Sequence, residues 1–162
     1  MCYDSFMIDL DIDDLHRFVV RAKAATYAGD GPSAESCRPG SRDLAYRDGR
    51  FAYLDSYFGG TDFIGQETVW LDGRAVWAMN YYGYILDEGK IAASEAGRVI
   101  KESLTLLYRH GRFLGGFENE TALGLYVDEN EGDVSHFRGM ERIERKGEKV
   151  YELLYHGGLI RD

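Results

Sequence analysis

The spacing of hydrophobic and polar positions predicts two helices, with a run of strands after each. Apolar side chains recur at helical spacing over residues 12–26, directly after the acidic run at residues 9–14. Asp11 or Asp13 can cap the free backbone amides at the start of this helix. A second apolar stripe over residues 93–109 predicts another helix of similar character.

Alternating apolar and polar residues predict four strands between the helices and four more after the second helix. Asp48-Gly49 and Asp72-Gly73 separate paired runs, and Asp-Gly favours a tight hairpin turn because both residues tolerate positive φ. Lys146-Gly147 takes the place of Asp72-Gly73 at the last hairpin turn. A glycine-rich connection at residues 111–120 precedes the last four strands. The expected strands cover residues 42–47, 51–58, 66–71, 75–84, 121–128, 133–138, 139–146 and 149–156.

One pattern occurs twice, at residues 63–83 and again 74 positions later at residues 137–157. Seven of the 21 aligned positions are identical, and the alignment needs no gap. The shared residues include a Phe-x-Gly-x-Glu motif, which ends at Glu67 in the first copy and at Glu141 in the second. A repeat of this kind indicates two structurally similar halves with a seam between them.

We therefore expect a single α+β domain, residues 1–162, built from two pseudo-repeats of about 11–91 and 92–162. Each pseudo-repeat would contain one helix and about four antiparallel strands. Together they would form a curved antiparallel sheet with the helices on one face. An alternative topology exchanges the first strand between the halves, as in duplicated dioxygenase-type modules. The strand face that carries Trp77 and Met79 is expected to pack against the helices.

Composition favours a soluble cytoplasmic protein. The net charge of −9 opposes direct nucleic-acid binding, which requires clustered Lys and Arg. The four His are scattered, and Cys2 and Cys37 have neither metal-binding nor redox spacing, so we expect no metal and no cofactor. The N-terminus is too acidic for a signal peptide, and no segment has the length and hydrophobicity of a membrane span.

The two equivalent glutamates are the main candidates for chemistry. Glu67 and Glu141 can face one another if a pseudo-dyad passes between the halves. Paired carboxylates can then share a proton, bind a cation, or act as acid and base. The alternative is that each glutamate binds backbone amides in its own half and shapes the local turn.

A ligand site is expected where the two halves differ from one another. Aromatic walls would hold an apolar or cationic ligand, and carboxylates would orient it. The predicted function is therefore small-molecule binding or sensing, in a cleft between the halves. The residues expected to line this cleft are Tyr57, Glu67, Trp70, Asn80, Tyr82, Glu141 and His156.

Two other classes of function remain open. The first is a small enzyme, a hydrolase or isomerase that uses Glu67 with Glu141, or His156, as its acid–base groups. The second is a protein-interaction module that self-associates through a sheet edge or an aromatic surface, for example as a homodimer.

Five motifs stand out along the chain: CRPGSRDLAY (37–46), DSYFGG (55–60), GQE (65–67), WAMNYYG (77–83) and YHGG (155–158). Together they resemble an uncharacterised bacterial domain family. Members of that family occur alone or at the C-terminus of helix-turn-helix regulators of the XRE type. The resemblance implies a sensor of small molecules, and it carries over no catalytic residue. Cys37 stands where serine is expected in the first motif.

Overall fold

The computed structural model describes residues 9–29 and 33–161, which form two helices and nine strands. Cys2 and the N-terminal segment up to residue 8 lie outside the described residues. The helices are α1 (Ile12–Ala25) and α2 (Ala93–Arg109). The strands are β1 (Ser33–Ala34), β2 (Arg42–Asp48), β3 (Phe51–Gly59), β4 (Phe63–Leu71), β5 (Arg74–Ile85), β6 (Phe117–Thr121), β7 (Gly124–Asp133), β8 (His136–Arg145) and β9 (Glu148–Leu159).

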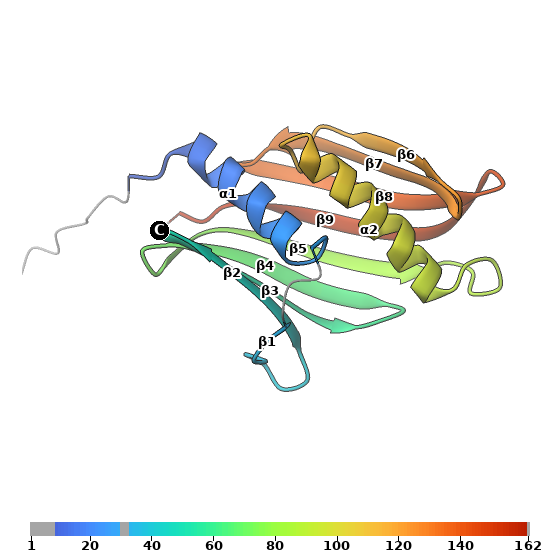
Figure 1. Cartoon of the computed structure of the whole chain (residues 1–162), viewed down its shortest axis with the longest axis horizontal. Coiled ribbons are helices and arrows are strands. Elements are labelled where there is room, and N and C mark those ends of the chain that lie inside the picture. The colour runs from blue at the N-terminus through green and yellow to red at the C-terminus, as the bar shows by residue number, and fades with distance from the viewer. Residues whose placement is uncertain (1–8, 30–32, 162) are drawn as a thin grey trace, which may run out of the picture.

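All nine strands belong to one antiparallel sheet, in the order β1-β2-β3-β4-β5-β9-β8-β7-β6 (Figure 1). The strands before α2 form one side of the sheet and the strands after it form the other. They meet where β5 pairs with β9, and Tyr81 lies opposite Tyr155 there. The long-range pairing of β5 with β9 thus joins segments far apart in the chain.

The expected fold class, a curved sheet made of two repeats of one helix and about four strands, is wrong. The structure instead has a single nine-stranded antiparallel sheet with two helices. Residues 117–121, expected to be part of a connection, form the edge strand β6. Gly139 lies inside β8 and does not divide it into two strands, because backbone pairing continues through it.

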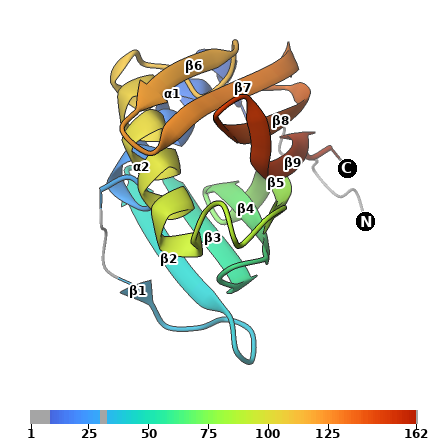
Figure 2. The same ribbon diagram turned by 90° about the vertical axis from the view of Figure 1, so that its right-hand side faces the viewer.

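Both helices match the ranges that hydrophobic spacing predicts, and both lie on the same face of the sheet (Figure 2). The Asp11 carboxylate accepts a hydrogen bond from Asp14 N at 2.9 Å, which confirms the predicted N-cap. At the start of α2, the Glu95 side chain accepts one from Ala92 N at 2.9 Å. Neither helix in the described part of the chain has the length and apolar character needed to cross a bilayer.

The hydrophobic core fills the space between the helices and the inner face of the sheet. Trp77 is fully buried there and donates a hydrogen bond from Nε1 to the Val134 carbonyl at 2.9 Å. On α1, Phe18 stacks on Phe51 with ring centroids 4.8 Å apart. Burial of a side chain such as Phe18 stabilises the fold by roughly 1.5–3 kcal/mol. The prediction that the Trp77 and Met79 face packs against the helices is confirmed.

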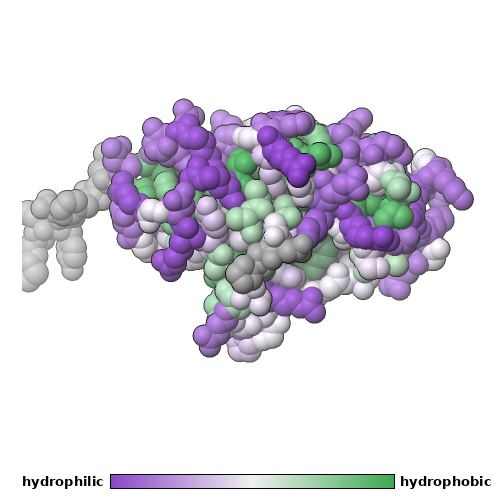
Figure 3. All heavy atoms as spheres, viewed as in Figure 1, coloured by the Kyte–Doolittle hydropathy of each residue, from purple (hydrophilic) through white to green (hydrophobic). Residues whose placement is uncertain are grey.

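The helix-bearing side of the molecule is hydrophilic over most of its surface (Figure 3). Smaller hydrophobic areas show between the hydrophilic side chains, over the space that the helices and the sheet enclose. Polar residues on the outer faces of both helices therefore cover a largely apolar interior, as the amphipathic pattern of each helix requires.

Candidate functional site

The residues predicted for one cleft lie on two opposite faces of the sheet. One group faces the helices and consists of Tyr57, Glu67 and Glu141. A second group lies on the outer face and consists of Asn80, Tyr82 and His156. Trp70 lines neither the inner cavity nor the outer hollow. The structure therefore brings only the first group together, in an inner cavity beneath α1 and α2.

A one-residue shift of strand register decides which side chains of the neighbouring strand share a face with each of the two glutamates. Regular pairing from the hairpin turn would place Glu67 opposite Ala78, whose side chain points away from the helices. The register instead shifts within this strand pair, and Glu67 lies opposite Met79 on the inner face. An equivalent shift places Glu141 opposite Leu153. Both carboxyl groups therefore point into the molecule.

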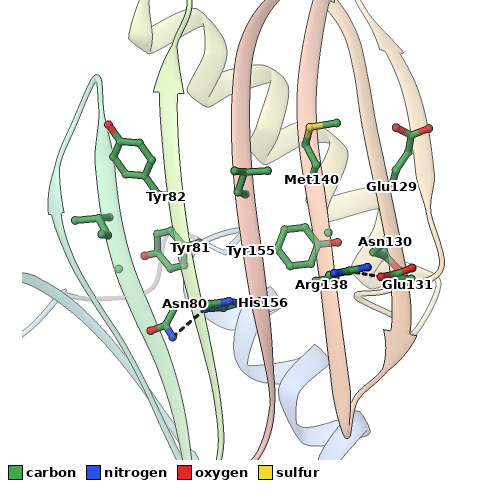
Figure 4. A pocket seen from close by; sticks show the side chains of 14 residues that line it. Asn80, Tyr81, Tyr82, Glu129, Asn130, Glu131, Arg138, Met140, Tyr155 and His156 are labelled. Carbon is green, nitrogen blue, oxygen red and sulfur yellow. Dashed lines mark hydrogen bonds and ion pairs between the residues drawn. The ribbon is translucent and has the colours of Figure 1, made fainter.

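The outer hollow is broad and open, with a volume of about 900 Å³ (Figure 4). Tyr82, at 44% exposed, stands on its rim. The polar groups in it largely satisfy one another: Asn80 Nδ2 lies 3.4 Å from His156 Nε2, and Arg138 forms an ion pair with Glu131. This surface therefore has the properties of an ordinary solvated sheet face with some exposed apolar area.

The inner cavity is smaller, about 240 Å³, and lies between the sheet and both helices. Seven of the 23 residues that line it are aromatic, and its charged side chains are three acidic and two basic. The tyrosines that line it are Tyr27, Tyr53, Tyr57, Tyr81, Tyr108 and Tyr151. The charged side chains that line it are Lys23, Arg42, Asp55, Glu67 and Glu141. Apolar walls with a few convergent polar groups are typical of small-molecule sites.

Lys23 forms a buried ion pair with Glu67 on one side of this cavity. Lys23 Nζ donates to Glu67 Oε1 at 2.7 Å, and both side chains are only 7% exposed. The lysine is brought there by α1, where it lies one turn after the buried Val19. Sequence reasoning missed Lys23, although its position between Ala22 and Thr26 on the apolar face was a usable signal.

Glu141 lies in the same cavity and has no ion-pair partner among the described residues. Its Oε2 atom is buried and has no hydrogen-bond partner in the described structure, and the same holds for Glu67 Oε2. Burial raises the pKa of the Glu141 carboxyl group to about 8. The charge of Asp128 adds to this shift, whereas Lys23 opposes it. At neutral pH, Glu141 is therefore mostly protonated.

Two further buried carboxylates, which the sequence did not single out, flank the glutamates. Tyr81 donates a hydrogen bond from its hydroxyl to Asp55 Oδ1 at 2.7 Å, and Tyr155 donates one to Asp128 Oδ1 at the same distance. Burial raises the pKa of both aspartates, and the tyrosine hydrogen bonds partly offset this effect. Asp55 thus adds a third carboxyl group to the wall of the inner cavity, and Asp128 lies beside Glu141.

The Gly of the Phe-x-Gly-x-Glu motif is explained by these tyrosines. A Cβ atom on Gly65 would lie 2.3 Å from Tyr81 Oη, and one on Gly139 would lie 2.3 Å from Tyr155 Cζ. Each ring therefore crosses a strand at a position where only glycine leaves room. The motif thus serves packing at its Gly and places a buried carboxyl group at its Glu.

The arrangement can bind hydrogen-bond donors and exchange protons with them. Within residues 9–29 and 33–161, no group of three or more His, Cys, Asp or Glu side chains is positioned to hold a metal ion. The unpartnered oxygens belong to carboxyl groups, which accept hydrogen bonds when ionised. The site is therefore suited to an organic ligand with donor groups.

One comparison with known proteins gives a match. A family model described as a domain of unknown function (DUF5680) matches residues 55–160, which include Asp55, Glu67, Asp128 and Glu141. Lys23 lies before the matched region. No curated protein and no solved structure matches the chain.

Proposed function

The chain belongs to this family of domains of unknown function, and we propose that its inner cavity binds a small organic molecule. The recognised group is a hydrogen-bond donor, in its simplest form a protonated amine. One observation carries the proposal: Glu67 and Glu141 each bury a carboxyl oxygen that has no partner in the described residues. A buried polar atom without a partner costs about 1–3 kcal/mol, and a bound donor would remove that cost.

A cation can compensate the acidic groups of the cavity better than an anion can. Asp55, Glu67 and Glu141 line the cavity beside Arg42 and Lys23, and Lys23 is already held in its ion pair with Glu67. A cation beside Glu141 would favour the ionised form of that carboxyl group. The tyrosine rings offer faces on which a cation is attracted by the ring quadrupole. An acid would instead bring a further carboxyl group among Asp55, Glu67 and Glu141, so acids are expected to bind more weakly than amines.

Amine binding should release a proton from Glu141. The raised pKa of about 8 keeps this carboxyl group protonated at pH 7, and a cation beside it favours the ionised form. Calorimetric titration at pH 7 in buffers of different ionisation enthalpy therefore measures a proton released as the amine binds. The released proton distinguishes binding at Glu141 from binding at a solvent-exposed carboxylate, which is already ionised at pH 7.

A thermal-shift screen tests the proposal with three matched sets of compounds: primary amines, the corresponding carboxylic acids and the corresponding alcohols. A ligand at one hundred times its dissociation constant stabilises the folded state by about 2.7 kcal/mol, which corresponds to about 5–11 °C for a chain of this size. We expect such shifts from some amines and from none of the acids. Glu141→Gln should abolish the shift, while His156→Ala on the outer face should keep it.

Two results would contradict this function. One is that no amine raises the melting temperature of the wild-type protein. The other is that His156→Ala abolishes the shift and Glu141→Gln does not, because the ligand would then sit on the outer face.

Proton-transfer catalysis is a second candidate, favoured by the unequal environments of Glu67 and Glu141. Glu67 forms an ion pair with Lys23, whereas burial raises the pKa of Glu141 to about 8, and an acid–base enzyme needs two carboxyl groups in such unequal environments. His156, on the opposite face, is not positioned to join them. A bell-shaped pH profile of turnover that loses its basic limb in Glu141→Gln would support this activity.

A further inference from the structure

Gly97 occupies an unusual position, in the interior of α2 and on the wall of the inner cavity. Glycine disfavours the helical state because its backbone loses more freedom on folding than that of any other residue. A glycine at the fifth position of a 17-residue helix therefore calls for an explanation.

The usual structural reasons for a glycine do not apply to Gly97. Its φ is not in the positive region that favours glycine. A Cβ atom built on it would have no neighbouring atom within 4 Å, in contrast to Gly65 and Gly139, where the same atom would overlap a tyrosine ring. Neither backbone conformation nor close packing therefore requires a glycine here.

The empty space beside Gly97 is part of the cavity itself. Gly97 lines it together with Ala93, Ala96 and Ile100 of the same helix, and Tyr151 lines it from β9. Any larger side chain at position 97 would project into this space. The small residues of α2 thus leave a slot between the helix and the aromatic inner face of the sheet.

We infer that Gly97 sets the width of the inner cavity, so that it accepts an amine with a flat aromatic body. The inference rests on the proposed function and names the ligand class of the same site. The nitrogen of the ligand would lie at the unpartnered oxygens of Glu67 and Glu141, and its ring would lie in the slot beside Gly97. Offset or edge-to-face contact with Tyr151 would add to the affinity.

Tryptamine and propylamine are suitable probes, because both carry a primary amine and only tryptamine carries a ring that needs the slot. Calorimetric titration of the full chain measures both dissociation constants. Gly97→Leu should weaken tryptamine binding at least tenfold and change propylamine binding by less than threefold. Gly97→Met, whose side chain is more flexible, should show the same selective loss if the leucine variant fails to fold.

Two further variants separate this effect from a general effect on the helix. Gly97→Ala should raise the melting temperature by about 2–4 °C through helix propensity. It should weaken tryptamine only slightly. Ser94→Leu places the same new side chain at an exposed position of α2 and should leave both affinities unchanged.

Each outcome decides a different question. The inference is wrong if Gly97→Leu and Gly97→Met bind tryptamine as tightly as wild type, or if they lose affinity for both amines equally. Gly97 would then not select for a ring, while amine binding itself would stand. If the wild-type protein binds neither amine, the proposed function fails, and the inference fails with it.

Discussion

Glu67 and Glu141 occupy corresponding positions on the two sides of the sheet, yet their surroundings differ. Each glutamate follows a glycine by two residues, and each points toward the helices. On the first side, α1 places Lys23 within 2.7 Å of Glu67. On the second side, α2 places small residues such as Gly97 along the cavity that Glu141 lines, and Glu141 has no ion pair among the described residues.

This difference implies different roles for the two glutamates, although their positions are similar. A buried carboxylate that is ion-paired can serve as a fixed part of the fold, because its charge is already compensated. A buried carboxyl group without a partner destabilises the fold and is available to a ligand. The shared motif therefore places the two groups, and the unequal helices decide what each group can do.

The largest expected effect comes from removing the cation that makes the two glutamates unequal. Lys23→Met leaves Glu67 buried without its partner, which should lower the free energy of unfolding by about 3–5 kcal/mol. Urea denaturation at pH 7 measures this loss. The double variant with Glu67→Gln should recover part of it, because no unpaired charge then remains.

Arg21→Ala is the matched control on the same helix, since Arg21 forms an exposed ion pair with Asp48 at 3.0 Å. Its effect should stay within about 1 kcal/mol. If Lys23→Met is no more destabilising than Arg21→Ala, then Lys23 does not compensate the charge of Glu67, and the proposed contrast between the two glutamates is lost.

The second expected effect is the pH dependence that Glu141 imposes on stability. Burial raises the pKa of Glu141 to about 8, above the value near 4.5 in the unfolded chain. Between these values the native state holds a proton that the unfolded state releases, so stability falls as pH rises, by up to about 1.4 kcal/mol per pH unit. Urea denaturation at several values from pH 5 to 8.5 should show a shallower decline for Glu141→Gln than for wild type.

Asp55 and Asp128 have raised pKa values as well, so the variant should keep part of the slope. Glu118→Gln, at an exposed position of β6, is the control and should retain the full wild-type slope. An unchanged slope in Glu141→Gln would mean that Glu141 is ionised in the native state at neutral pH.

The fold was predictable where local patterns determine it. Hydrophobic spacing predicted both helices. Positive φ at Asp72 and Lys146 confirms the two hairpin turns predicted from Asp72-Gly73 and Lys146-Gly147. The pairing of β5 with β9 was not predictable, because it joins distant segments without a local signal. The expected strand boundary before Gly139 was wrong, since glycine occurs both at strand ends and at sites where an aromatic ring crosses a strand.

The candidate site was predictable only in part, because strand register decides which side chains share a face. Glu67 and Tyr82 were expected in one cleft, and the one-residue shift in the β4–β5 pairing separates them. No residue type in that hairpin predicts the register shift. Asp55 was missed for a related reason: its role depends on the hydroxyl of Tyr81, which reaches it across β4.

A third prediction compares the two tyrosines that bind buried aspartates. Tyr81→Phe removes the only side-chain hydrogen bond to Asp55 that the described structure shows, whereas Asp128 also accepts one from Asn130 Nδ2 at 2.7 Å. We expect a loss of about 1–3 kcal/mol for Tyr81→Phe and a smaller loss for Tyr155→Phe. Parallel urea denaturation curves measure both, and equal losses would show that Asn130 does not compensate.

The smallest expected effect concerns His156, which is the neighbour of Tyr155 on β9 but points to the opposite face. Its ring is exposed, and within the part of the chain that the structure describes its one side-chain polar contact is with Asn80 at 3.4 Å. His156→Ala should therefore change the free energy of unfolding by no more than about 0.5 kcal/mol and leave amine affinity unchanged. A loss comparable with that of Tyr155→Phe would mean that the outer face is covered in solution, because only a buried side chain costs that much to remove.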